Sequence, residues 1–251
     1  ALVVFLIFAP VQAYIGWRLI PNLPIDQSFK ILGSILYAGA ALLIPIGILA
    51  SVFVTRQPLA DRLLWAGSLA LGWFSSLLMV TLLRDIALLF ADEGTWAVES
   101  AVWAVTLSFV VTLVGFLNAR QTAKVVPVTI PLTNLQPALD GFTIAQITDV
   151  HVGPTIKGNY VRGIVKRVNA LHPDLIAITG DVVDGSVGQL SKDTAPLGTL
   201  EARHGVYLVT GNHEYYSGAE AWIDEFRRIG LTVLMNEHET LRHNGADLVI
   251  A

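Results

Sequence analysis

Apolar residues dominate the first half of the chain in long runs, whereas the second half alternates short apolar runs with amphipathic segments. Residues 31–55, 63–83 and 100–119 carry no charge and are long enough to cross a bilayer, which takes about 20 residues. Residues 1–17 form a fourth apolar run, which we interpret as a transmembrane helix clipped at its start; a cleaved signal peptide is the competing interpretation. The polar stripes of soluble helices are absent from these runs. The pattern predicts an N-terminal all-α bundle of four transmembrane helices over residues 1–120.

Two details of this bundle depend on single residues. Glycines within the runs, Gly47 and Gly67 among them, allow neighbouring membrane helices to approach closely. Arg84 and Asp85 are adjacent charged residues followed by further apolar residues at 86–91. They form either an intramembrane charge pair or the end of a span, with Arg84 extending to the interface. Because adjacent residues point to different faces of a helix, we favour the second interpretation.

The pattern changes after residue 120. Pro127, Pro131 and Pro137 interrupt residues 121–140, which we interpret as a connector with a candidate edge strand at residues 125–130. From residue 141 to 251 strands and helices alternate, which is typical of an α/β fold. We predict strands over residues 142–148, 175–179, 206–210, 231–234 and 247–251, helices over residues 160–171 and 219–229, and a hairpin flanked by His238 and His243. The last strand stops at residue 251, and we expect the domain to be truncated at its C-terminus.

Three short motifs follow three of these strands. They combine carboxylate, imidazole and amide side chains and read Asp149-Val150-His151, Gly180-Asp181-Val182-Val183-Asp184 and Gly211-Asn212-His213-Glu214. Asp149 and Asp181 are 32 positions apart, and Asp181 and Asn212 are 31 apart. The ends of successive buried strands are where open α/β sheets place their ligand sites. The three motifs in this order predict a metal site.

The donor types indicate which ions the site takes. Asp149 and Asp181 offer carboxylates and His151 offers an imidazole, while Asn212 adds an amide oxygen. This mixture suits Mn²⁺, Fe or Zn²⁺ better than Ca²⁺. A carboxylate that faces two sites can bridge metals about 3.5–4 Å apart, and a bridging hydroxide can then attack phosphorus in line. We therefore predict two divalent metal ions and a metal-dependent phosphoric ester hydrolase.

The leaving group of such a reaction needs a proton donor. His213 is adjacent to a predicted ligand, and Asp184 lies three residues beyond the bridging Asp181, where it could orient the imidazole. We predict His213 and Asp184 as the catalytic residues. Residues 214–216 either line the substrate entrance or pack elsewhere, and the sequence leaves both interpretations open.

Composition narrows the class of protein. The 251 residues are 53% hydrophobic and 14% charged, and the mean hydropathy is +0.60, too apolar for an ordinary soluble domain. The formal net charge of −4 gives no reason to expect a nucleic-acid partner. The chain has no cysteine, which excludes disulfides and thiolate ligands. We predict an integral membrane protein of the cell or inner membrane, with the lipid bilayer as its partner.

The distribution of basic residues bears on the side of the membrane. The side of the catalytic domain would carry Arg56, Arg62, Arg120 and Lys124, and the opposite side would carry Arg18, Lys30 and Arg84. Four against three is a faint lean toward a cytoplasmic catalytic domain.

Taken together, the three motifs resemble those of the calcineurin-like metallophosphoesterase superfamily. The apolar runs followed by Gly-Asn-His-Glu-Tyr-Tyr-Ser-Gly resemble its transmembrane branch, whose soluble relatives include YkuE- and YaeI-type phosphodiesterases. The resemblance covers residues 141–251 and implies an α/β two-sheet sandwich with a dimetal site at the strand ends. It assigns roles to six residues: the first metal to Asp149 and His151, the bridge to Asp181, the second metal to Asn212, and proton donation to His213 with Asp184.

That family also supplies three histidines, a lone one and a Gly-His-x-His pair, from later strands. We expect these beyond residue 251, and therefore expect residues 1–251 alone to be inactive. The four histidines outside the motifs are interpreted as hydrogen-bonded or solvated surface residues: His172, His204, His238 and His243.

The resulting hypothesis is a membrane-anchored dimetal phosphoesterase. It would hydrolyse a phosphomonoester, phosphodiester or pyrophosphate bond of a phosphorylated small molecule or lipid-linked substrate. The alternative is a non-catalytic membrane protein with a degenerate phosphoesterase domain. Its expected signature is the loss of a metal ligand or of His213, and the motifs retain each of these residues.

Overall fold

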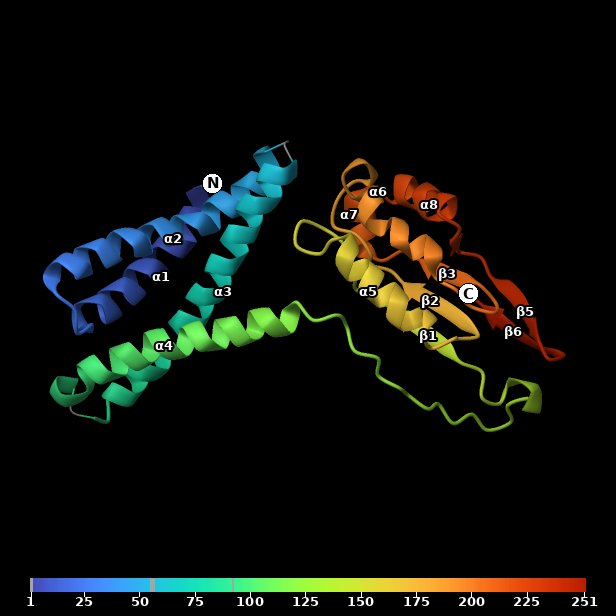
Figure 1. Ribbon diagram of the computed structural model, residues 1–251, viewed down its shortest axis with the longest axis horizontal. Coiled ribbons are helices and arrows are strands. Elements are labelled where there is room, and N and C mark those ends of the chain that lie inside the picture. The colour runs from blue at the N-terminus through green and yellow to red at the C-terminus, as the bar shows by residue number, and fades with distance from the viewer. Residues whose placement is uncertain (1, 55–56, 92) are drawn as a thin grey trace. The chain divides into compact units, whose positions relative to one another are not determined.

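Long helices fill the first half of the chain, and an α/β arrangement fills the second (Figure 1). The computed structural model describes residues 2–54, 57–91 and 93–251. It divides into two units, Ala1–Gln121 and Thr122–Ala251. Arg56, counted above for sidedness, and the end of the predicted run 31–55 lie outside the described residues.

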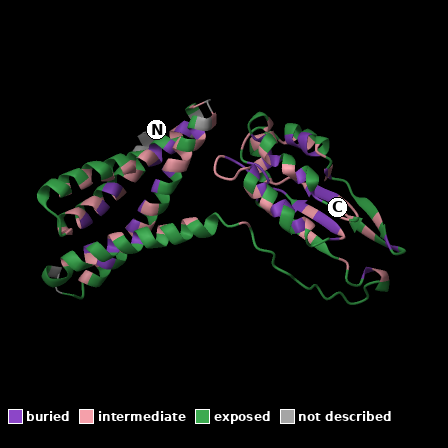
Figure 2. Ribbon diagram, in the orientation of Figure 1, coloured by how far each residue is buried: buried purple, intermediate pink, exposed green. Residues whose placement is uncertain are grey.

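The first unit consists of helices: α1 (Leu2–Leu19), the 3-10 turn η1 (Ile20–Asn22), α2 (Gln27–Phe53), α3 (Gln57–Leu88) and α4 (Glu93–Ala119). Among the described residues, three stretches are long and apolar enough to cross a membrane: Gln27–Ala50, Leu59–Leu88 and Gly94–Ala119. Exposed residues cover much of α2, α3 and α4 (Figure 2), and many of them are large and apolar, which is typical of helices surrounded by lipid. Three of the four predicted spans thus have the properties of membrane helices. The span predicted over residues 1–17 stays a prediction.

Helices α2 and α3 touch at a pair of glycines. A Cβ atom added to Gly47 would lie 2.9 Å from the carbonyl oxygen of Leu63, and one added to Gly67 would lie 2.7 Å from that of Leu43. Any larger residue would push the two backbones apart, so glycine is what permits this contact. The role predicted for glycines in the apolar runs is confirmed at this pair.

A cluster of charged residues joins α1, α3 and α4. Asp85 accepts hydrogen bonds from Tyr14 Oη at 2.6 Å and from Arg18 Nε at 2.7 Å. The Arg84 guanidinium donates to Asp85 Oδ1 and to Ser100 Oγ, both at 2.9 Å, and the Arg84 side chain is only 3% exposed. Helix α3 continues through both residues. The interpretation of a span ending at residue 83 is therefore wrong, because the long Arg84 side chain turns toward the adjacent carboxylate although the two Cα–Cβ directions diverge.

The second unit is built on a parallel sheet in the order β1-β2-β3-β4, followed by an antiparallel pair, β5–β6. Its strands are β1 (Ile144–Ile147), β2 (Leu175–Thr179), β3 (Val206–Val209), β4 (Thr232–Val233), β5 (Glu239–His243) and β6 (Ala246–Ile250). Its helices are α5 (Gly158–Asn169), α6 (Val187–Thr194), α7 (Asn212–Ser217) and α8 (Ala219–Arg228), with 3-10 turns η2 (Pro137–Leu139) and η3 (Ala195–Thr199). Each strand and helix predicted after residue 141 is present, with bounds shifted by at most a few residues.

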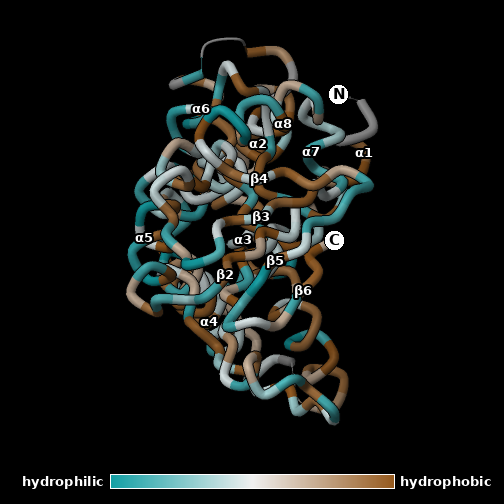
Figure 3. The backbone as a smooth tube through the Cα atoms, turned by 90° about the vertical axis from the view of Figure 1, so that its right-hand side faces the viewer, coloured by the Kyte–Doolittle hydropathy of each residue, from teal (hydrophilic) through white to brown (hydrophobic). Residues whose placement is uncertain are grey.

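Different layers cover the two faces of the parallel sheet. Alternate strand residues bury one face against α5, α6 and α8, where Trp222 and Phe226 are fully buried. On the other face, Leu175 and Tyr207 pack against Leu241 of the β5–β6 hairpin. The strands of the parallel sheet are largely apolar, while the covering helices carry hydrophilic stretches (Figure 3). The β5–β6 hairpin is a two-stranded second sheet packed on the first. His243 ends its first strand, so His238 and His243 do not flank the hairpin as predicted.

The connector does not contain the edge strand considered for residues 125–130. These residues have no regular secondary structure, and Val126, Val128 and Ile130 are between 73% and 76% exposed. Pro127 lacks the amide hydrogen that a strand ladder needs, and Pro131 lacks it directly after the segment. The strand prediction is wrong for this segment.

The histidines outside the motifs fall into two groups. His204 Nε2 lies 2.8 Å from His243 Nδ1, and Asn244 Nδ2 lies 2.9 Å from His243 Nε2. His172 and His238 are exposed. All four are thus hydrogen-bonded or solvated, but His243 is buried rather than on the surface.

Candidate metal centre

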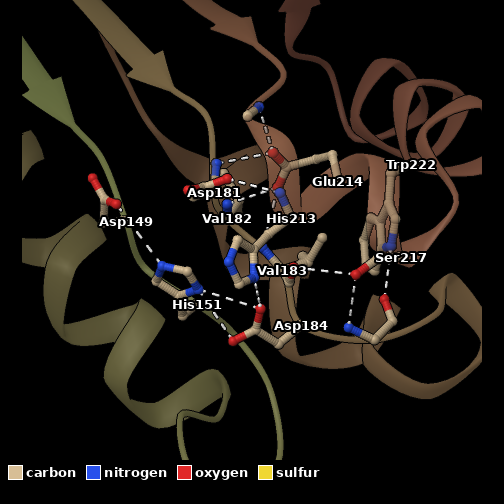
Figure 4. Close-up of polar contacts among 12 residues, drawn as sticks. Asp149, His151, Asp181, Val182, Val183, Asp184, His213, Glu214, Ser217 and Trp222 are labelled. Carbon is tan, nitrogen blue, oxygen red and sulfur yellow. Dashed lines mark hydrogen bonds and ion pairs between the residues drawn. The ribbon is translucent and has the colours of Figure 1, made fainter.

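The three motifs meet at one edge of the parallel sheet. Asp149 and His151 follow β1, Asp181 and Asp184 follow β2, and His213 lies in α7 directly after β3. Because β1, β2 and β3 are parallel neighbours, their carboxyl ends are at the same edge. The polar side chains of the three motifs converge there (Figure 4).

Backbone hydrogen bonds continue between the first two motifs beyond the strands. His151 N donates to Asp181 O at 3.1 Å, and Val152 N donates to Val182 O at 2.7 Å. Asp184 N donates back to Val152 O at 2.8 Å. The two loops are therefore joined like an extra stretch of parallel ladder, which fixes His151 and Asp184 on neighbouring segments.

Three predicted metal ligands have an uncommon backbone conformation. The φ angle is 54° at Asp149, 50° at His151 and 53° at Asp181, all in the left-handed region. Non-glycine residues rarely adopt this region, although aspartate and histidine do so more often than most. Such conformations cost about 1–3 kcal/mol each and persist where the surrounding structure enforces them, often at functional sites.

Glycines of the second and third motifs allow the corresponding loops to touch. Gly180 has a φ of +81°, and a Cβ atom there would collide with the amide nitrogen of Gly211. A Cβ atom on Gly211 would in turn collide with the Asp181 carboxylate. Both motifs thus begin with glycine because their backbones are in contact next to the candidate ligands.

Asp149, His151 and Asp181 form a group of donors that fits one metal ion. Each offers one ligand atom, and the three atoms lie within 4.8 Å of one another. His151 Nε2 is 3.8 Å from Asp149 Oδ1, too far for a hydrogen bond but short enough for both atoms to reach one cation at about 2.0–2.2 Å. The other Asp149 oxygen accepts a hydrogen bond from Thr148 Oγ1 at 2.5 Å. The Asp149 side chain is 62% exposed, so an ion could enter from solvent.

The Asp184 carboxylate holds two imidazoles. His151 Nδ1 lies 3.1 Å from Asp184 Oδ2, and His213 Nδ1 lies 2.5 Å from Asp184 Oδ1. Because an ionised carboxylate only accepts, both Nδ1 atoms carry the hydrogen, and the Nε2 atom of His151 is left as a metal ligand. The hydrogen bond to Asp184 raises the pKa of the His213 imidazole above its ordinary value. The predicted contact of Asp184 with His213 is present, and the contact with His151 was not foreseen.

These three side chains also constitute a second candidate group of metal donors. Ligand atoms of His151, Asp184 and His213 lie within 4.8 Å of one another, and the two imidazole rings are 4.4 Å apart, edge to face. Asn212, the remaining predicted ligand, is the exposed first residue of α7. The amide of the next residue donates to Asp181 Oδ1 at 2.9 Å, which brings the start of α7 next to the predicted bridging carboxylate.

Comparison with known families agrees with this geometry. Residues 142–248 match the family model of the calcineurin-like phosphoesterases. This matched stretch of the second unit is thus similar to a calcineurin-like phosphoesterase domain, and it is called the phosphoesterase domain below. Members of this family are metal-dependent phosphoester hydrolases that use divalent ions, in keeping with the donor groups at the sheet edge.

The phosphoesterase domain also carries the similarity to individual relatives. The chain is 38% identical over 141 residues to a transmembrane protein with metallophosphoesterase domain from Danio rerio, covering 56% of this chain and 32% of the relative. The protein of the same name from Bos taurus is 38% identical over 144 residues, 57% of this chain and 32% of the relative. The uncharacterized metallophosphoesterase YkuE of Bacillus subtilis is 29% identical over 116 residues, 45% of this chain and 41% of the relative.

The chain thus spans about a third of the length of the transmembrane relatives it matches. No solved structure is significantly similar to it. The relatives' names and the three membrane-capable helices together indicate that the phosphoesterase domain belongs to a membrane protein.

Two residues of the phosphoesterase domain have roles that the sequence left open. Glu214 is fully buried and accepts four backbone hydrogen bonds, so it does not line a substrate entrance. Tyr216 is 79% exposed, and its ring lies 5.5 Å from that of His213. Tyr215 is also exposed, at 60%, so burial excludes Glu214 alone from the surface among residues 214–216.

Proposed function

We propose that this chain is a membrane-anchored dimetal phosphoesterase. The observation that carries the proposal is the shared Asp184 carboxylate, which contacts the imidazole of His151, the proposed metal ligand, and the imidazole of His213, the proposed proton donor. This arrangement serves hydrolysis directly, since one imidazole must remain unprotonated at Nε2 and the other must deliver a proton. The family match of residues 142–248 supports the same reaction class.

Asp149, His151 and Asp181 would hold the first cation, and Asp181 with Asn212 would hold the second. The mixture of carboxylate, imidazole and amide donors suits Mn²⁺, Fe or Zn²⁺. When bound, two such cations neutralise charge on the phosphate and acidify a water molecule. Asp181 is suited to the bridging position because it lies between the β1 loop and the start of α7.

His213 would donate a proton to the leaving oxygen. Its Nδ1 atom is hydrogen-bonded to the Asp184 carboxylate, so the proton available to a substrate is the one on Nε2. Asp184 acts through the two imidazoles and is a positioning residue. Tyr216, exposed beside His213, would contact the group that leaves.

The substrate would carry a phosphomonoester, phosphodiester or pyrophosphate bond. Anchoring by membrane helices keeps the site near lipid headgroups, which favours a lipid-linked phosphate over a freely diffusing one. A comparison of vesicles containing a phospholipid monoester with a soluble aryl phosphate would separate these classes of substrate.

Activity can be tested on the full-length protein that contains this sequence, purified from membranes in detergent and stripped of metal with EDTA. Hydrolysis of bis(p-nitrophenyl) phosphate should return with added Mn²⁺ and disappear again in excess EDTA. His151→Gln, purified identically, controls for contaminating phosphatases and should remain inactive with Mn²⁺. Turnover in EDTA, or equal turnover by the variant, would contradict the proposal.

The alternative, a non-catalytic protein with a degenerate domain, predicts damage to the site. Instead, the six predicted site residues are retained, and the described contacts bring five of them to one sheet edge: Asp149, His151, Asp181, Asp184 and His213. A degenerate domain has no need for three strained left-handed residues at the ligand positions. This observation favours the enzyme.

A further inference from the structure

We propose that Glu214 is a positioning residue that sets the separation of the two metal-binding loops. The part of this inference that concerns cation binding rests on the proposed function. Glu214 is fully buried in the last position of the third motif, next to His213, and its carboxylate meets backbone amides rather than the side chains of the candidate site. Figure 4 shows its carboxylate directed into the backbone of the second motif.

Four backbone amides converge on this carboxylate. Asp181 N donates to Oε2 at 2.9 Å, Val182 N donates to Oε1 at 2.7 Å, and Val183 N donates to Oε1 at 3.2 Å. Gly211 N supplies the fourth bond, to Oε2 at 2.7 Å. Three donors come from the loop after β2 and one from the loop after β3, so a single side chain joins the two loops.

The three consecutive amides point the same way because of the local backbone. Gly180 has a φ of +81° and Asp181 one of +53°, both in the left-handed region. Successive N–H groups in such a turn form a concave anion-binding nest. Here the anion in the nest is the Glu214 carboxylate of the same chain. A buried carboxylate needs hydrogen bonds to offset its loss of hydration. The amides of the nest in turn need an acceptor, so the carboxylate and the nest satisfy each other.

A second hydrogen bond runs in the opposite direction. The Asp181 carboxylate accepts the amide of His213 at 2.9 Å. The loop after β2 and the start of α7 are therefore joined by hydrogen bonds in both directions. The Glu214 carboxylate accepts backbone amides around Asp181, and the Asp181 carboxylate accepts the backbone amide of His213. This reciprocal pair fixes where the candidate bridging carboxylate lies relative to Asn212. Glu214 would thus define the distance between the two cation positions without touching either cation.

Glu214→Gln tests the inference with little change in shape. The amide keeps one acceptor oxygen but places an NH₂ group against N–H donors, so at least one loop loses its bond. We expect hydrogen exchange at the amides of residues 181–183 and 211 to rise at least 10-fold in the metal-free full chain. We expect the affinity for Mn²⁺, measured by titration, to fall about 10–100-fold, as for other residues that orient ligands. Glu220→Gln, the same change on the exposed side of α8, should alter neither quantity.

Glu214→Asp provides a conservative rescue, since it keeps both acceptor oxygens on a side chain one methylene shorter. Its Mn²⁺ affinity should fall between those of the wild type and Glu214→Gln. Unchanged exchange or unchanged Mn²⁺ affinity in Glu214→Gln would overturn the inference. So would equally increased exchange across β2 and α5, because that would make Glu214 a general folding residue. A full-length wild-type protein that hydrolyses nothing, combined with the expected exchange and affinity changes, would refute the proposed function and leave this inference standing.

Discussion

The Asp184 carboxylate is shared by the two imidazoles of the candidate site, His151 and His213. Its two oxygens set the tautomers of His151 and His213, at 3.1 and 2.5 Å respectively. A carboxylate is required there, because an amide cannot accept hydrogen bonds through both of its terminal atoms. Loss of Asp184 should therefore affect metal binding and proton donation together, whereas loss of either histidine should affect one of them.

Asp184→Asn should show whether Asp184 supports metal binding through His151 and proton donation through His213, or only the stability of the fold. One imidazole would face the amide NH₂ group and adopt the wrong tautomer, so Mn²⁺ affinity should fall about 10–100-fold. Turnover at saturating Mn²⁺ should remain low, because His213 is also affected. Titration with Mn²⁺ and steady-state kinetics measure the two effects, with Asp224→Asn on the exposed side of α8 as the matched control. Normal turnover once Mn²⁺ is saturating would limit Asp184 to metal binding.

His213→Ala should lower turnover and leave the metal content unchanged. A general acid contributes about 10²–10⁴-fold, and its absence matters most when the leaving group is an alkoxide that cannot depart without a proton. We expect a large loss with an alkyl phosphoester and a much smaller one with a p-nitrophenyl ester, whose leaving group is stable as an anion. Metal analysis after desalting completes the test. If the variant were empty of metal, His213 would be a ligand and the assignment would be wrong.

At the scale of elements, the strands and the positions of the motifs followed from the sequence, because short apolar runs ended in polar residues three times in succession. The left-handed φ angles of Asp149 and Asp181 could not be predicted, since they arise from contacts between loops that are distant in sequence. The role of Glu214 was hidden for the same reason: its partners are backbone amides, which carry no sequence signal. The Arg84–Asp85 contact shows a further limit, because side-chain reach can override helical geometry.

Asp174 offers a test of how β1 and β2 are held together at their starts. Its Oδ2 atom accepts hydrogen bonds from Thr143 N at 2.9 Å and Thr143 Oγ1 at 3.0 Å, and the backbone bond is the main reason that the Asp174 pKa lies below its ordinary 3.8. A lowered pKa stabilises the fold above 3.8, and this stabilisation disappears as the pH falls through the lowered value. Asp174→Asn should therefore be less stable at pH 7 and should lose less stability than the wild type between pH 4 and pH 3.

Scanning calorimetry of the full chain in detergent at several pH values would measure this difference. Asp140→Asn, an exposed aspartate in the same region of the chain, is the control and should follow the wild type. Parallel pH profiles for Asp174→Asn and the wild type would show that the hydrogen bonds to Thr143 do not contribute to acid sensitivity.

At the scale of the whole molecule, the two units carry different features. Among the described residues, the membrane-capable helices all lie in the first unit and the candidate metal groups all lie in the second. An anchored hydrolase meets only those substrates that are present on its own side of the membrane. The orientation of the helices would therefore decide which phosphates an enzyme of the proposed class can reach, and this orientation is the property that the basic residues predict.

Cysteine labelling can determine that orientation, because the chain contains no cysteine and each introduced one reports alone. Leu89→Cys lies between α3 and α4 at a position that is 79% exposed, and Glu201→Cys lies in an exposed loop of the phosphoesterase domain. The excess of basic residues on the domain side favours a cytoplasmic domain. A membrane-impermeant maleimide should then label Leu89→Cys in intact cells and Glu201→Cys only after permeabilisation, while the cysteine-free chain stays unlabelled. The reverse pattern would place the active site outside the cytoplasm, where lipid-linked phosphates of the outer leaflet would be its substrates.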